Sequence, residues 1–145
     1  MQAKKRSGTR SAASSKPPEA LVYFLDESLD NLTVATALRG AGASVVRSTD
    51  HFPKGTTDEV WLAKAGENRW IVLTRDKRIR YRQLERLALQ AAKVRAFVFT
   101  GGNVTSKDTA AILVGALERM AKIARVDPGP FIYHIGRSGK PIRME

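Results

Sequence analysis

The sequence predicts an α/β protein of three layers, in which helices cover both faces of a mostly parallel central sheet. Short apolar runs rich in β-branched and aromatic residues alternate along the chain with segments of helical periodicity. Parallel strands need crossover connections of roughly a dozen residues or more, which helices usually supply. At 145 residues, of which 43% are hydrophobic, the chain is expected to form one domain with a substantial core.

The alternation can be followed element by element. Apolar runs predict four strands at residues 21–25, 43–46, 70–74 and 94–100. Helices are expected at 30–39, from Thr56 onward, at 80–91, and from Thr105 to about Ala124. Thr56 and Glu59 have the spacing of a capping box, and Thr105 with Asp108 resembles a second N-terminal cap. Residues 131–135 and 141–144 are expected to form a terminal strand or hairpin around a turn that contains glycine.

Composition narrows the class of protein further. Residues 1–18 are polar, rich in serine and basic without an acid, so we expect a disordered basic arm before a folded domain at 19–145. The absence of cysteine excludes disulfides, thiolate catalysis and cysteine-ligated zinc, and two histidines argue against a histidine-rich zinc site. No apolar stretch approaches the roughly 18–20 residues that span a bilayer, and no signal-peptide core follows the basic start. A cytoplasmic protein is therefore expected.

Three carboxylates are placed where they can meet. Asp26 follows the first predicted strand, Asp76 follows the third, and Asp58 lies in the first turn of a helix. The carboxyl ends of parallel strands share one edge of the sheet, so these acids can converge there if the first and third strands are neighbours. Converging carboxylates repel one another unless they share a cation, and hard oxygen ligands suit Mg²⁺ or Mn²⁺. Taken singly, each acid is more often a cap or a turn residue.

Other polar residues are weaker candidates for the same site. Glu27 follows Asp26 directly but also suits a cap for the next helix. Glu59 fits the capping role, so we favour Asp58 as the ligand at that helix and Glu59 as mainly structural. Asn103, after the fourth strand, is a candidate for a further polar ligand.

The chain carries a net charge of +11, which favours association with a polyanion such as nucleic acid. Basic side chains concentrate between residues 77 and 95, at Lys77, Arg78, Arg80, Arg82, Arg86, Lys93 and Arg95. Arg78, Arg82 and Arg86 are spaced four apart, so they share one helical face along which a phosphodiester backbone can lie. The alternatives are a solvated surface, a face for an acidic protein, or charge that serves solubility alone.

The acidic segments Asp26-Glu27-Ser28-Leu29, Thr57-Asp58-Glu59-Val60 and Leu73-Thr74-Arg75-Asp76-Lys77 resemble the three acidic motifs of PIN-like nucleases. The resemblance is strongest to the compact members that act as toxins in VapC-type toxin–antitoxin pairs, and it covers most of the chain from Leu21. It implies a Mg²⁺- or Mn²⁺-dependent endoribonuclease with Asp26, Asp58 and Asp76 as its acidic cluster. It also implies an RNA substrate and a cognate antitoxin protein, and it leaves open whether the chain forms a homodimer. In related sequences a further acid often stands near the position of Arg78, so this chain departs from the pattern there.

Two alternatives remain at this point. One is a nucleic-acid-binding PIN-like domain whose active site is degenerate, as Arg78 suggests. The other is a phosphoacceptor receiver domain, which shares with this chain acids after the first and third strands, a threonine after the fourth and a Lys-Pro pair (Asp26, Glu27, Asp76, Thr100, Lys140 and Pro141). A whole helix between Thr100 and Lys140, and the lack of a role for Asp58, argue against the receiver.

Overall fold

A computed structural model describes residues 20–76 and 83–144, and it contains one six-stranded sheet. The strand order is β2-β1-β3-β4-β5-β6, in which β1 to β5 run parallel and β6 pairs antiparallel with β5. The strands are β1 (Val22–Leu25), β2 (Ser44–Arg47), β3 (Ile71–Thr74), β4 (Arg95–Phe99), β5 (Phe131–Ile135) and β6 (Pro141–Arg143). The predicted arm at residues 1–18 lies outside the described residues.

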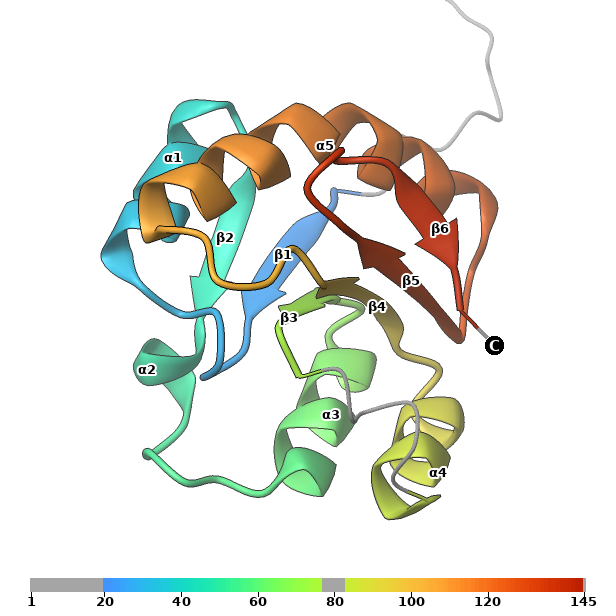
Figure 1. Ribbon diagram of the computed structural model, residues 1–145. Coiled ribbons are helices and arrows are strands. Elements are labelled where there is room, and N and C mark those ends of the chain that lie inside the picture. Colours follow the sequence, from blue (N-terminus) through green and yellow to red (C-terminus); the bar gives the residue numbers. More distant parts are fainter. Residues whose placement is uncertain (1–19, 77–82, 145) are drawn as a thin grey trace, which may run out of the picture.

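Helices cover both faces of this sheet and form the outer layers (Figure 1). They are α1 (Leu32–Gly40), α2 (Ser48–His51), α3 (Asp58–Glu67), α4 (Gln83–Ala91) and α5 (Ser106–Val126). The α1 and α5 helices lie together on one face, and α3 and α4 lie together on the other (Figure 1). The predicted three-layer α/β fold with a mostly parallel sheet is thereby confirmed.

Alternation along the strands assigns side chains to two separate cores. Tyr23 and Leu25 of β1 pack under α1 and α5, whereas Phe24 between them packs with Trp61 and Trp70 on the opposite face. The central strands β3 and β4 are buried along their whole length. Such continuously apolar strands are expected when helices cover both faces of a parallel sheet.

Several predicted boundaries are wrong in detail, and the reasons are local. The first helix begins at Leu32 with Asn31 as its N-cap, because the Asn31 side chain accepts from the Val34 N–H at 2.9 Å. The capping box at Thr56 does not form, since Thr56 Oγ1 donates to Pro53 O at 2.6 Å and Thr57 precedes the helix. No helix was expected at α2, because four residues give no readable periodicity. The cap at Thr105 is confirmed, with Thr105 Oγ1 accepting from Asp108 N at 3.0 Å.

Close packing between α3 and α4 depends on one glycine. A Cβ on Gly66 would lie 2.3 Å from the carbonyl oxygen of Ala92, so no larger residue fits there without displacement of the backbone. Within the described residues, no helix is long and apolar enough to cross a membrane.

Candidate functional site

The carboxyl ends of β1 and β3 lie side by side and open into a cavity of about 450 Å³. The chain passes from β1 to β2 on one side and continues from β3 on the other, which makes this the point where the strand order reverses. Open α/β sheets bind their ligands at such a point. The cavity is lined by Asp26, Glu27, Ser28, Ser48, Pro53, Thr56, Asp58, Trp61, Arg75 and Asp76. The three aspartates predicted from the sequence therefore line one cavity.

Asp26 is the most buried of these acids, with a relative exposure of 6%. Burial raises the pKa of its carboxyl from the ordinary value of 3.8 to about 6. Hydrogen bonds from Ser28 and Thr74 act in the opposite direction, and the negative charge of Asp58 adds to the increase. The elevated pKa indicates that Asp26 is in a position where ionisation is costly without a nearby cation.

Two hydroxyl groups connect Asp26 to the segment that carries Asp76. Ser28 Oγ donates to Asp26 Oδ1 at 2.6 Å, and Thr74 Oγ1 donates to Asp26 Oδ2 at 2.7 Å. The same oxygens accept backbone N–H groups from the segment after β3, Ser28 Oγ from Arg75 at 2.9 Å and Thr74 Oγ1 from Asp76 at 3.0 Å. Each hydroxyl therefore acts both as donor and as acceptor, and together they fix the end of β1 against the end of β3.

Asp58 reaches the cavity from the first turn of α3. Its Oδ1 accepts from the indole N–H of Trp61, one turn later, at 2.9 Å. The Trp61 ring packs on Phe24 of β1 with 5.6 Å between ring centroids. The indole thus anchors the Asp58 side chain to the core while the acid remains at the helix N-terminus, where the dipole favours negative charge.

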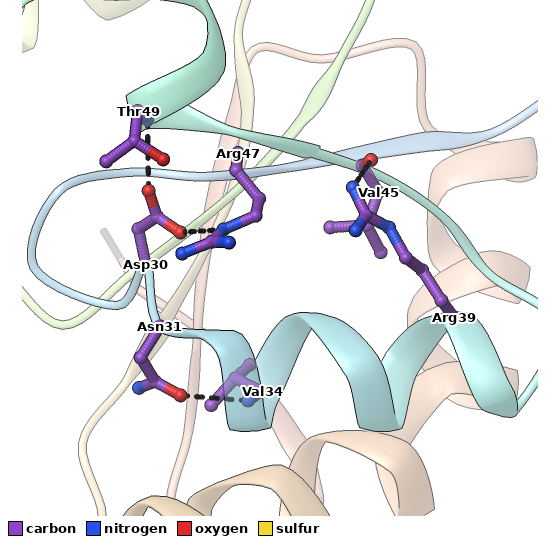
Figure 2. Close-up of polar contacts among 7 residues, drawn as sticks. All are labelled: Asp30, Asn31, Val34, Arg39, Val45, Arg47 and Thr49. Carbon is purple, nitrogen blue, oxygen red and sulfur yellow. Dashed lines mark hydrogen bonds and ion pairs between the residues drawn. The ribbon is translucent and has the colours of Figure 1, made fainter.

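An ion pair braces the loop after β1 against the junction of β2 and α2 (Figure 2). Arg47 Nε lies 2.6 Å from Asp30 Oδ1, and Asp30 Oδ2 accepts from the backbone N–H of Thr49 at 3.0 Å. The Asp30 side chain is 1% exposed. Because Ser48 lies between Arg47 and Thr49 and lines the cavity, this brace connects the loop after β1 to the cavity wall.

The other residues predicted for the site do not all lie at the cavity with the three aspartates. Glu27 is exposed at the cavity, whereas Glu59 faces a groove between α3 and α4. Asn103 is exposed in the loop after β4 and is not among the residues that line the cavity. Arg86 is exposed on α4, and Arg78 and Arg82 lie outside the described residues. Arg95 does not belong to a basic face, since it is 1% exposed and donates to the carbonyls of Ala124 and Arg69.

The donor set of the cavity suits a hard divalent cation in its chemistry. All four of its acidic side chains offer carboxylate oxygens, which Mg²⁺ and Mn²⁺ prefer. In the part of the chain that the structure describes, no three acidic or histidine side chains already converge on a common coordination point. Shared coordination by Asp26, Asp58 and Asp76 therefore requires their side chains to turn farther into the cavity.

Ser28, Thr74, Ser48 and Arg75 line or support the cavity but were not predicted from the sequence. A signal existed for Ser28, because an aspartate side chain often accepts from the backbone N–H two residues later and so closes a turn there. Its backbone N–H does donate to Asp26 Oδ1, at 3.1 Å. Thr74, as the last residue of an apolar strand, resembled an ordinary strand residue.

Comparison with known proteins gives one match. A family profile described as "PIN like domain" matches residues 21–101, which is more than half of the chain. That stretch contains Asp26, Asp58 and Asp76. No curated protein and no solved structure matches the chain.

Proposed function

The chain belongs to the family of PIN-like domains, a nuclease-type fold, and on that premise we propose that it is a metal-dependent endoribonuclease. The proposed reaction is hydrolysis of a phosphodiester bond in RNA. The observation that supports it most is the position of Asp26, Asp58 and Asp76 on one cavity at the carboxyl edge of the sheet. The three acids come from distant parts of the chain, so their proximity is a property of the fold.

In this proposal Asp26, Asp58 and Asp76 hold Mg²⁺ or Mn²⁺. When bound, such a cation supplies positive charge that neutralises the phosphoryl centre and activates the attacking water. Ser28 and Thr74 hold the Asp26 carboxylate at the cavity through their hydrogen bonds, and a bound cation would compete with these bonds for its oxygens. Trp61 holds Asp58 in the same way. Glu27, exposed at the same cavity, is a further acid within the proposed site.

RNA is proposed as the substrate because the chain is strongly basic. Arg86 is exposed on α4, and together with the predicted neighbours Arg78 and Arg82 it would extend a cationic track from the segment that follows Asp76. Binding through such a track weakens steeply as salt rises. The further proposal that this nuclease is the toxin of a type II toxin–antitoxin pair rests on the resemblance of its acidic motifs to VapC-type toxins. A cognate antitoxin would then inhibit it by covering the cavity.

The test is cleavage of single-stranded RNA by the purified protein in Mn²⁺, with EDTA as the metal-free comparison. Asp58→Asn and Asp76→Asn are each expected to lower the cleavage rate by at least about a hundredfold, because each removes a charged ligand from the cavity. Glu118→Gln removes one acid from the exposed surface of α5 and serves as the matched control. Cleavage by either aspartate variant at the rate of the Glu118→Gln protein would refute the assigned site.

A second candidate function is RNA binding without cleavage. It is favoured by the lack, within the described residues, of three acidic side chains already converged for a cation. This candidate predicts RNA binding that is equal in Mn²⁺ and EDTA, and no cleavage in either. A receiver domain is disfavoured, since the family match covers the acidic segments and Asp58 lines the cavity, where a receiver has no role for it.

A further inference from the structure

Two arginines bind the same short turn beside the acidic cavity. Arg75 Nη2 donates to the carbonyl oxygen of Gly102 at 2.9 Å, and Arg137 Nε donates to that of Gly101 at 2.7 Å. Arg75 follows β3, the two glycines follow β4, and Arg137 lies two residues beyond β5. The turn thus brings together two guanidinium groups from the strands on either side of β4.

The turn that holds both arginines is restricted to glycine at its two positions. Gly102 has a φ of +76°, which side chains with a Cβ rarely adopt. A Cβ on Gly101 would lie 2.3 Å from the ring of Phe99. The Arg75 guanidinium also lies over the Phe99 ring, 5.3 Å from its centroid, and this contact directs it toward the turn.

Neither arginine forms an ion pair with a carboxylate among the residues that the structure describes. This holds even though Arg75 lines the same cavity as four acidic side chains. A guanidinium has five N–H donors in a planar fork, and the glycine carbonyls account for one hydrogen bond from each arginine. Two cations brought to adjacent residues repel one another unless they share an anion.

We infer that Arg75 and Arg137 form a phosphate clamp, which holds a phosphate of the RNA backbone next to the acidic cavity. The planar fork of a guanidinium matches two phosphate oxygens, which a lysine ammonium does not. The choice of RNA as the anion rests on the proposed function. Arg75, at the cavity wall, orients the strand relative to the acids, and Arg137 binds the phosphate from the outer side of the turn.

The clamp can be tested by binding alone. Fluorescence anisotropy of a labelled single-stranded RNA oligonucleotide is measured in EDTA, over a series of salt concentrations, for the wild-type protein and for Arg75→Gln with Arg137→Gln. The matched control is Arg119→Gln with Lys122→Gln, which removes the same charge from the exposed surface of α5. Circular dichroism checks that each variant is folded, and Arg137→Gln alone, at an exposed position, replaces the double variant if that does not fold.

We call the Arg75→Gln, Arg137→Gln double variant the clamp variant. We expect it to bind RNA at least about tenfold more weakly than the wild type at low salt, because hydrogen bonds to charged groups are lost. The slope of log affinity against log salt should become less steep by about 0.7, which is the change expected when one phosphate contact on a single strand is lost. The single Arg137→Gln variant should change the slope by less, because Arg75 still contacts the phosphate. Arg75→Lys, which keeps the charge and removes the fork, should keep the slope but weaken binding.

If the clamp variant binds RNA with the same affinity and the same salt slope as the control, the clamp is refuted. It is also refuted if the wild-type protein does not bind RNA. These outcomes are separable from failure of the proposed function, because cleavage is assayed independently in Mn²⁺. Cleavage by the wild type with unaltered binding by the clamp variant removes the clamp and leaves the nuclease. Arginine-dependent binding without any cleavage removes the nuclease and supports the clamp.

Discussion

Asp26 combines a buried position, which favours a neutral side chain, with a proposed role that requires the ionised carboxylate. It is almost fully buried, yet its two oxygens receive hydrogen bonds that favour the ionised form. Burial outweighs those bonds, and the pKa rises to about 6. A carboxylate kept in such a position reduces stability at neutral pH unless a cation compensates its charge.

This gives a prediction for the metal-free protein. Because the pKa of Asp26 is higher in the folded chain than in the unfolded chain, the folded state holds the proton more tightly between about pH 4 and pH 6. Protonated Asp26 therefore stabilises the folded state by about 3 kcal/mol. This contribution is fully present below pH 4 and is lost as the pH rises through 6. Asp26→Asn should therefore raise the free energy of unfolding at pH 7.5 in EDTA.

Urea unfolding at pH 4, 5, 6 and 7.5, followed by tryptophan fluorescence, measures the effect. Trp61 and Trp70 are both buried and report on the core. Subtraction of the Asp26→Asn curve from the wild-type curve isolates the contribution of this one carboxyl. A variant that is less stable than the wild type at pH 7.5 would contradict the prediction.

At the scale of the element, helix starts show how similar sequence signals can have different outcomes. Thr105 and Thr57 both precede a helix with an extended backbone. The Thr105 side chain accepts from Asp108 N, whereas the Thr57 side chain makes no cap hydrogen bond. Thr56, the residue expected to cap, closes the preceding turn through Pro53 instead. The spacing of residues along the chain therefore does not predict which residue caps a helix when a neighbouring turn competes for the same hydroxyl group.

Thr105→Ala should lower the free energy of unfolding by about 1 kcal/mol, since it leaves the Asp108 N–H without its side-chain acceptor. Thr57→Ala removes the same atoms from a helix start without a cap hydrogen bond, and it should change stability by clearly less. Chemical denaturation measures the free energy of unfolding of the two variants and of the wild type, and the two losses are compared. Equal losses would mean that the Thr105 hydrogen bond contributes nothing of its own.

At the scale of the whole molecule, the order of the strands is what assembles the cavity. The pairing of β1 with β3 places Leu25 opposite Leu73, so Asp26 and Asp76 emerge from neighbouring strands. The α3 helix begins at the same edge and supplies Asp58. Three segments that the chain separates by many residues thus form one wall, and a cation shared among them would cross-link β1, α3 and β3.

A shared cation should accordingly stabilise the whole fold. At a Mn²⁺ concentration of about one hundred times the dissociation constant, the wild-type protein should gain about 2.7 kcal/mol and show a higher Tm than in EDTA. Asp76→Asn should lose most of this gain, and Glu118→Gln should keep it. Thermal unfolding in both buffers provides the readout. An equal Tm increase in the Asp76→Asn protein would show that Mn²⁺ binds elsewhere.

The sequence alone was sufficient for the class of fold, for the approximate strands and helices and for the family. Those properties depend on hydrophobic periodicity and on short acidic segments, which are local along the chain. It also indicated that Asp26 and Asp76 would reach one edge, because the handedness of βαβ crossovers leaves little choice.

Only the tertiary structure decided what surrounds those acids. The raised pKa of Asp26, the hydrogen bonds from Thr74 to Asp26 and from Arg75 to Ser28, and the brace between Asp30 and Arg47 all depend on contacts between segments far apart in sequence. The burial of Arg95 and the meeting of Arg75 with Arg137 depend on such contacts as well. Desolvation and hydrogen-bond partners are set by packing in three dimensions, so no pattern along the chain encodes them directly.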